Sequence, residues 1–325
     1  MTILGLKTSQ SIILVYFKGT EFLEHKKLVF DDIRLDKHIT YFTFRKPVYS
    51  TTNPPMIYIG YRSGLVALAH CNDQKIIRVF NYDEKTKQCY KKEPVTMITV
   101  VPDSGGDQIL VLYQDSTVMK YLASVPETNM NFIEKLKKLE SKISFNKEKN
   151  RLKHQRKKNK NNICYGSLLN DSFPEFNYFF AENEDLPIKN PLQYLKFNHR
   201  TITDITIKKH KSFTKTLLKG SINTKEPTVF AFTSLDGYLL IYDYSQMTPL
   251  LSYKGVFGGF NTLTFSENCE LIALSGQDDC ITVLDLNSLE TIRCEGHKSF
   301  VCKTIFQPIP LEGDMGDKQE DTMDK

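Results

Sequence analysis

A short unit of strands and tight turns recurs along this 325-residue chain and restricts its fold more than any other feature. Each copy has an apolar strand, a polar turn and a second apolar strand. The four copies are residues 56–69, 109–122, 229–242 and 271–284. Short apolar runs bounded by turn residues are typical of β-strands that are buried on both faces.

The turn of each copy holds a pair of small or polar residues that tolerate a tight backbone. The four pairs are Ser63-Gly64, Asp115-Ser116, Asp236-Gly237 and Asp278-Asp279. We expect each pair to form a two-residue hairpin turn. A metal site at Asp278-Asp279 is the alternative, but adjacent aspartates point apart and supply too few oxygen ligands for a hard cation. We therefore expect no metal and no other cofactor.

Further strand-like runs lie before and after these hairpins, which gives each unit four strands. The runs are residues 39–44, 95–101, 202–207 and 260–265 before the hairpins, and 75–80 and 290–295 after them. From Ser63 to Asp115 is 52 residues, and from Asp236 to Asp278 is 42. Four strands at a period in the forties predict the blades of an all-β propeller.

The formal charge of +5 is concentrated in one segment. Residues 134–160 carry twelve Lys and Arg against three acids, whereas the last fourteen residues carry six acids and two lysines. The rest of the chain is close to neutral, which argues against a nucleic-acid-binding face on the folded body.

The basic segment begins with apolar residues at helical spacing and then becomes too polar to bury a core. The apolar residues are Phe132, Ile133, Leu136, Leu139 and Ile143. We expect an inserted helix followed by a solvated loop; nuclear localisation or RNA contact is the alternative. The predicted division is propeller blades in 1–124, the basic insert in 125–188, further blades in 189–308 and an acidic disordered tail in 309–325.

Membrane and redox signals point to a chain in the cytoplasm, with the nucleus as the alternative. No apolar run approaches the length of a membrane span, and the first residues suggest strands rather than a signal peptide. The seven cysteines include no CxxC pair, which favours reduced thiols over disulfides or zinc.

Residues 253–306 resemble the CreC-type catabolite-repression proteins, which are related to the animal WD-repeat activator subunit of ubiquitin-specific proteases. The resemblance lies in Phe257-Gly258-Gly259, in the turn at residues 276–279, and in Gly296-His297-Lys298-Ser299 before Phe300. Residues 189–197 are similar to the family's Asn-Pro segment, and the earlier hairpins resemble its blades more loosely.

The resemblance implies a WD-repeat propeller that is not an enzyme. It implies a scaffold that binds and activates a ubiquitin-specific protease, in deubiquitination and in catabolite repression. The family's partner-contacting aromatics match Phe257 and Phe300, with Lys298 on the polar rim. The alternative is that both phenylalanines are ordinary residues at the start of a strand that cover the core. Gly258 and Gly259 are expected to serve the backbone turn. In such blades Gly-His introduces the first strand, so Gly296 and His297 are expected to be structural, with the imidazole bonded to a turn carboxylate of the same blade.

The sequence departs from the family in two ways. It has no tryptophan, and Tyr242-Asp243 and Leu284-Asp285 stand where Trp-Asp is usual, so the hydrogen-bonded tetrad of regular blades is expected to be degraded. We find four fuller units and parts of others, which predicts an incomplete ring or one completed by another chain. The alternatives are a WD-repeat scaffold in another assembly, such as ribosome biogenesis or trafficking, or nucleic-acid association through the insert.

Overall fold

The structure is a computed structural model of the 325-residue chain. It describes residues 2–45 without 19 and 33, 56–124 without 85 and 86, 176–180, 190–197, 201–213, 217, 226–245 and 249–307. The predicted helix with its apolar stripe, the basic segment 134–160 and the acidic tail 309–325 lie outside these described residues.

The described residues form five antiparallel sheets, which we number in chain order, and one two-stranded ribbon. Sheet 1 comprises β1 (Thr2–Lys7), β2 (Ile12–Lys18) and β3 (Glu21–Leu28). Sheet 2 comprises β4 (Ile39–Phe44), β5 (Met56–Tyr61), β6 (Val66–His70) and β7 (Ile76–Phe80). The ribbon pairs β8 (Tyr82–Asp83) with β9 (Gln88–Cys89).

The remaining sheets hold three of the four repeated hairpins. Sheet 3 has the order β10 (Val95–Val100), β11 (Gln108–Tyr113), β12 (Thr117–Leu122), β14 (Gln193–Phe197) and β13 (Phe176–Phe180). Sheet 4 comprises β15 (Ile202–Lys209), β16 (Thr228–Ser234), β17 (Tyr238–Asp243) and β18 (Pro249–Lys254). Sheet 5 comprises β19 (Phe260–Phe265), β20 (Leu271–Gly276), β21 (Ile281–Asp285) and β22 (Thr291–Cys294).

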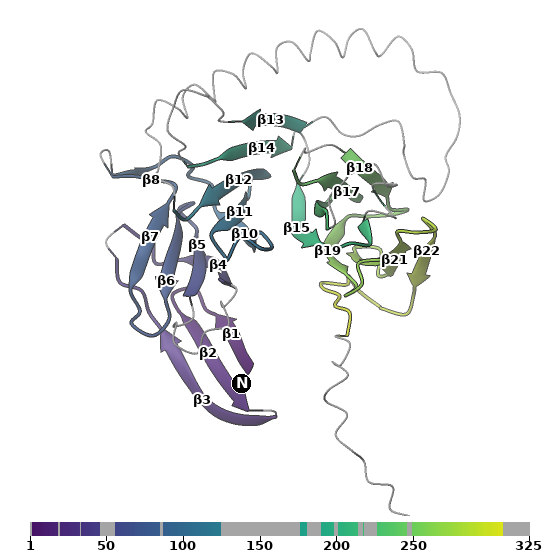
Figure 1. Ribbon diagram of the computed structural model, residues 1–325. Helices are drawn as coiled ribbons and strands as arrows, with labels where there is room; N and C mark the ends of the chain where they lie inside the picture. The colour runs from purple at the N-terminus through teal and green to yellow at the C-terminus, as the bar shows by residue number, and fades with distance from the viewer. Residues whose placement is uncertain are drawn as a thin grey trace, which may run out of the picture.

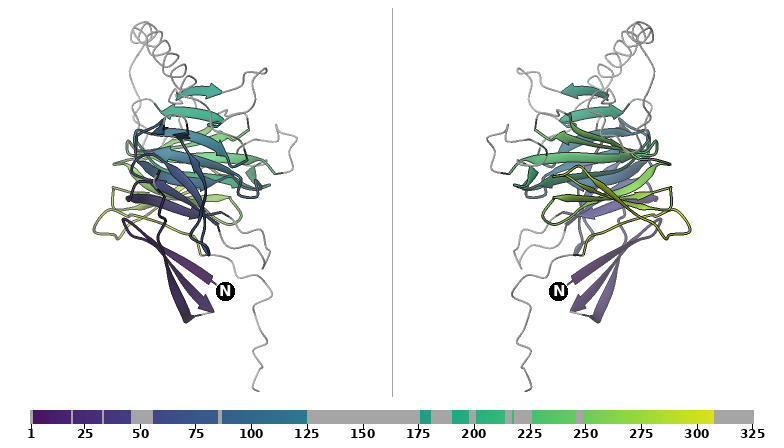
Figure 2. Two further views of the ribbon diagram at one scale, coloured as in Figure 1. Left: turned by 90° about the vertical axis from the view of Figure 1, so that its left-hand side faces the viewer. Right: turned by 90° about the vertical axis from the view of Figure 1, so that its right-hand side faces the viewer.

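The sheets follow one another in an arc around their first strands (Figure 1). Strand β1 contacts β4, β4 contacts β10, β10 contacts β15, and β15 contacts β19. Sheets 1 and 5 are the two ends of the arc, and side views show sheet 1 tilted away from the other sheets (Figure 2). The predicted all-β fold with blade-like four-stranded units, consistent with a WD-repeat propeller, is confirmed.

The core consists of apolar layers between consecutive sheets. In β16, Phe230 and Phe232 pack toward sheet 3, whereas Val229 and Ala231 pack toward sheet 5, and all four are fully buried. Similar layers join sheet 1 to sheet 2 and sheet 2 to sheet 3. Because both faces of such a strand are covered, its sequence is a continuous apolar run rather than an alternating one.

The hairpin loops of the four repeats have three residues, so the prediction of two-residue turns was wrong. The loops are residues 62–64, 114–116, 235–237 and 277–279. Their third residues have positive φ: 90° at Gly64, 62° at Ser116, 80° at Gly237 and 59° at Asp279. A left-handed third residue is typical of three-residue hairpin loops, and Gly, Ser and Asp tolerate it to different degrees.

The four repeats also share a bulge and a hydrogen bond at the start of their first strands. The bulged residues are Thr40, Thr96, Thr203 and Asn261. In each repeat the first loop residue donates its amide to the residue before the first strand: Arg62 to His38, Gln114 to Pro94, Leu235 to Thr201 and Gln277 to Gly259. These features define structurally equivalent positions in the four sheets.

One strand of sheet 3 comes from the predicted insert 125–188. Strand β13 pairs with β14, which in turn pairs with β12. The fully buried Asn190 fixes the return of the chain, because its side-chain amide exchanges two hydrogen bonds of 2.9 Å with the backbone of Leu122. The insert therefore adds a strand to the sheet as well as interrupting the repeat.

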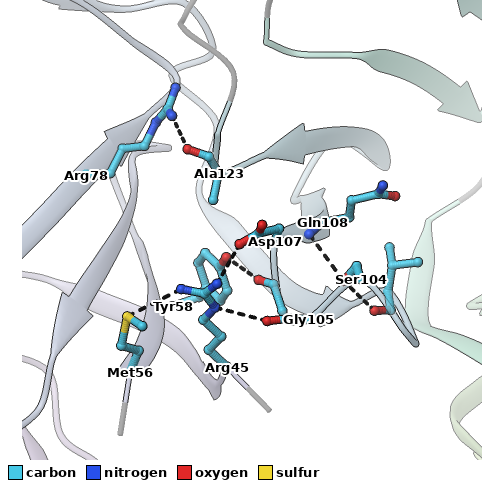
Figure 3. A network of polar contacts seen from close by, with 11 residues as sticks. Arg45, Met56, Tyr58, Arg78, Ser104, Gly105, Asp107, Gln108 and Ala123 are labelled. Atoms are coloured by element: carbon cyan, nitrogen blue, oxygen red, sulfur yellow. Dashed lines mark hydrogen bonds and ion pairs between the residues drawn. The ribbon is translucent and has the colours of Figure 1, made fainter. Parts of the chain in front are cut away.

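A polar network ties sheet 2 to the β10–β11 loop (Figure 3). Arg45, just after β4, donates to the Asp107 carboxylate at 2.5 Å and to the Gly105 carbonyl at 3.3 Å. The buried Tyr58 donates its hydroxyl hydrogen to the Gly106 carbonyl at 2.5 Å. These contacts close the outer part of an interface whose centre is apolar.

The two aspartates at the expected Trp-Asp positions make local hydrogen bonds. Asp243 accepts the amide of Ser245 at 2.8 Å, and Asp285 accepts the amide of Asn287 at 2.7 Å. Both therefore stabilise the turn that follows the third strand of their sheet. These contacts hold a turn within one sheet.

A buried carboxylate links sheets 4 and 5. Asp204 is 9% exposed, and its Oδ2 accepts the amide of Leu263 on β19 at 2.9 Å. Burial raises the pKa of Asp204 from 3.8 to about 6, although two backbone amides and Lys303 act in the opposite direction. The folded chain therefore binds this proton more tightly than the unfolded chain does.

We predict that Asp204 makes stability fall as pH rises from about 4 to about 7. Between 3.8 and about 6 the folded state holds the extra proton, and that stability is lost as pH rises through the folded pKa. At roughly 1.4 kcal/mol per unit, the loss is about 3 kcal/mol relative to Asp204→Asn, which keeps an acceptor for Leu263. Urea unfolding of the wild type and of Asp204→Asn across this pH range measures the loss, with Asp73→Asn at an exposed carboxylate as the control. Parallel curves of unfolding free energy against pH for the wild type and Asp204→Asn would contradict the prediction.

Candidate partner-binding surface

The two predicted contact aromatics are exposed. Phe257 is 64% exposed in the segment between β18 and β19, and Phe300 is 58% exposed after β22. Lys298 is exposed in the same segment as Phe300. Exposed aromatic side chains are common anchors of protein interfaces, so both residues are candidates for a binding surface.

The glycines after Phe257 allow two loops to pack closely. Gly258 has a φ of 67°, and a Cβ on Gly259 would lie 2.2 Å from the Leu235 carbonyl oxygen. Gln277 donates its amide to the Gly259 carbonyl at 2.9 Å. The segment that carries Phe257 thus lies between the 235–237 loop of sheet 4 and the 277–279 loop of sheet 5.

Phe300 lies on the other side of the 277–279 loop. The next residue, Val301, donates its amide to the Gly276 carbonyl at 3.1 Å. Asn261 donates to the Val301 carbonyl at 2.8 Å, just as the equivalent Thr203 donates to the Phe260 carbonyl at 2.7 Å. Val301 therefore takes the place that Phe260 has in the preceding sheet.

This equivalence refines the sequence prediction. Phe257 and Phe300 come from corresponding segments, but Phe257 lies three residues before Phe260 and Phe300 lies one residue before Val301. The structure brings both aromatics to the same loop from opposite sides.

Sequence reasoning missed a third apolar residue at this place. Leu235 is 45% exposed and begins the loop whose backbone contacts Gly259. The three equivalent loops begin with polar residues, Arg62, Gln114 and Gln277. An apolar residue at this position is the feature of the sequence that could have identified Leu235. We call Leu235, Phe257 and Phe300 the exposed apolar surface.

An ion pair lies beside this surface. Arg293 on β22 pairs with the Asp278 carboxylate at 3.0 Å. His297 is exposed, and no hydrogen bond joins it to Asp278 or Asp279 in the described part of the chain. Arg293 reaches Asp278 because β22 runs beside β21, and the structural role expected of His297 stays a prediction.

The remaining predicted turn residues lie at the same end of sheets 4 and 5. Asp236 accepts the Ser234 hydroxyl, and its backbone carbonyl accepts the ammonium of Lys254. Gly296 has a φ of 128° and open space around its Cα, so only its backbone conformation favours glycine.

The described residues contain no group of three His, Cys, Asp or Glu side chains that could hold a metal ion. Six of the cysteines are free thiols, and Cys71, Cys269 and Cys280 are buried. None of the helices in the described ranges is long and apolar enough to cross a membrane.

Comparisons with known proteins support the WD-repeat class. No protein-family model matches the chain. It is 35% identical over 89 residues to a WD repeat-containing protein 20 homolog of Caenorhabditis elegans, covering 27% of the chain and 12% of that protein. It is 26% identical over 121 residues to the UBP9-binding protein bun62 of Schizosaccharomyces pombe, covering 37% of the chain and 22% of that protein.

These matches span less than a quarter of either relative's length. Neither relative is named as a CreC-type protein, so that finer assignment stays a prediction. The similarity supports a WD-repeat protein related to protein-binding scaffolds.

Substitution of Gly237 tests the packing that positions Phe257. A Cβ at this residue would lie 2.4 Å from the Gly258 carbonyl oxygen, in a backbone of φ 80°. We expect Gly237→Ala to lower the free energy of unfolding by about 2 kcal/mol or more, from the left-handed strain and the clash together.

The matched control is Gly105→Ala. Gly105 also has a positive φ, of 61°, but a Cβ there meets nothing within 4 Å. Gly105→Ala should therefore lower the free energy of unfolding only through backbone strain, by about 1 kcal/mol. Urea unfolding midpoints compare the two variants, and equal losses would show that the two loops do not pack as described.

Proposed function

We propose that this chain is a non-catalytic WD-repeat scaffold that binds and activates a ubiquitin-specific protease. The observation that carries the proposal is the exposed apolar surface, with Phe257 and Phe300 on the two sides of one loop. A loop fixed by backbone hydrogen bonds loses little entropy when a partner docks. Exposed aromatic residues in such a setting are the usual anchors of a protein interface.

The nature of the partner is supported by the comparisons. The name of one relative says that it binds UBP9. The segment with Phe257 and Phe300 is also the one that resembles the activator family. The match covers only part of both proteins, so the protease partner is our proposal for this chain.

Activation needs no catalytic group from the scaffold. A scaffold that binds the productive conformation of a protease more tightly than its other conformations raises the population of that conformation. The rate then rises without any new chemistry. We place this activity in the cytoplasm or the nucleus, as the free thiols suggest, with a role in catabolite repression as its finer form.

The test is a comparison of Phe257→Ala/Phe300→Ala with the wild-type chain. Each tagged form is used to recover proteins from its native cells, and the recovered protease is assayed on a fluorogenic ubiquitin substrate. We expect recovered protease and activity to fall roughly tenfold or more in the double variant, because each buried aromatic anchor contributes about 2 kcal/mol.

The matched control is Phe22→Ala on β3 of sheet 1. Phe22 is 55% exposed, so this variant removes a similar apolar area from another part of the molecule. It should recover the protease as the wild type does. Equal recovery by all three folded forms would exclude the two phenylalanines from the interface, and the absence of any ubiquitin-specific protease would contradict the proposed function.

A further inference from the structure

A cavity of about 230 Å³ lies where sheets 1 and 2 meet. Most of its wall is formed by the segment between β3 and β4, and the rest by the β1–β2 turn and the ends of β4 and β5. Its lining residues are Gln10, Val29, Phe30, Asp31, Asp32, Leu35, Asp36, Lys37, Ile39 and Tyr61. We call it the acidic pocket.

The acidic pocket lies at the same end of the sheets as the exposed apolar surface. The backbone amide of Arg62 donates to the carbonyl of His38 at 3.0 Å. The equivalent hydrogen bond in sheet 5 joins the amide of Gln277 to the carbonyl of Gly259. Asp36 therefore lies three residues before the first strand of its sheet, as Phe257 does in sheet 5.

The charges of the pocket favour a cation. Three carboxylates line it against the single ammonium of Lys37. Arg34 neutralises Asp32 through contacts of 2.9 and 2.7 Å, and these hydrogen bonds lower the pKa of Asp32. Asp31 is exposed and makes no ion pair in the described part of the chain, and Asp36 is half-buried. These two carboxylates remain to attract a positive group.

The tyrosine in the wall lacks a hydrogen-bond partner. Tyr61 is 2% exposed, and its hydroxyl bonds to nothing among the described residues. Burial raises its pKa, and the charges of Asp32 and Asp36 add to the effect. Buried polar groups are nearly always satisfied, and an unsatisfied one beside a cavity indicates a missing donor or acceptor.

We propose that the acidic pocket binds an arginine or lysine side chain of a protein partner. Val29, Phe30 and Leu35 provide an apolar wall for the methylene groups of such a side chain. Its charged head then meets the carboxylates of Asp31 and Asp36. It donates to the Tyr61 oxygen, which is closed to solvent in the structure, once the wall opens around it. The pocket shares its docking side with the exposed apolar surface but does not require the partner to be a protease.

The test uses the full chain and a neutral pentapeptide with one central arginine. The peptide is titrated into ¹⁵N-labelled protein, and its isosteric citrulline counterpart is the matched neutral probe. We expect the arginine peptide to shift amides of the 29–39 segment and of Tyr61, and the citrulline peptide to shift them at least about fivefold less, because it lacks the charge. Equal shifts from both peptides, or shifts confined to other residues, would overturn the proposal.

Two variants separate binding from folding. Asp31→Asn/Asp36→Asn should weaken arginine-peptide binding roughly tenfold, whereas Asp73→Asn, at an exposed carboxylate of sheet 2, should leave it unchanged. Tyr61→Phe should weaken binding about threefold without lowering the melting temperature, because the hydroxyl has no partner within the described protein. Equal losses in the Asp73 variant would reduce the effect to general electrostatic attraction.

The test is independent of the proposed function. Phe257→Ala/Phe300→Ala should leave binding of the arginine peptide unchanged, because neither residue lines the pocket. Loss of peptide binding in this double variant would overturn the assignment of the cation to the acidic pocket.

Discussion

Apolar packing between consecutive sheets is the interaction on which the rest of the structure depends. A four-stranded sheet cannot hide its own faces, so each is stable only where a neighbour covers it. Sheet 4 shows the consequence, because Phe230 and Phe232 serve one neighbour while Val229 and Ala231 serve the other. Hydrogen bonds such as that of Asp204 to Leu263 then fix the relative position of two sheets that the apolar layer holds together.

The same constraint explains where apolar side chains stay exposed. Sheets 1 and 5 have a described neighbour on one side only, and residues on their other faces are open: Leu4 and Leu6 are 50% and 49% exposed, and Ile292 is 67% exposed. Ile292 pairs with Val283, whereas the adjacent Leu284 faces sheet 4 and is fully buried. Exposure here follows from the position of the sheet in the arc, unlike that of Phe257, which lies in the loop between β18 and β19.

The loops at one end of the sheets carry different chemistry on one repeated backbone. The hydrogen bond that joins Gln277 to Gly259 also joins Arg62 to His38, so the segments before β19 and β4 have the same support. The segment before β19 carries the aromatic ring of Phe257, and the segment before β4 carries the carboxylate of Asp36 beside a cavity. A rigid repeat of this kind can vary its contact residues without changing its fold, which is how propellers acquire partners.

The repeat and its strands could be predicted from the sequence because alternation of strands and turns is a local pattern. All four hairpins were found, although their loops have three residues rather than two, a difference that depends on which strand residues pair. Contacts between distant residues were decided only by the tertiary structure. The pairing of Arg293 with Asp278, the place of Leu235 beside Gly259, and the pocket around Tyr61 each join segments whose proximity depends on how strands and sheets pack. No local pattern encodes such proximity, since the packing that creates it is set by side chains far apart in the chain.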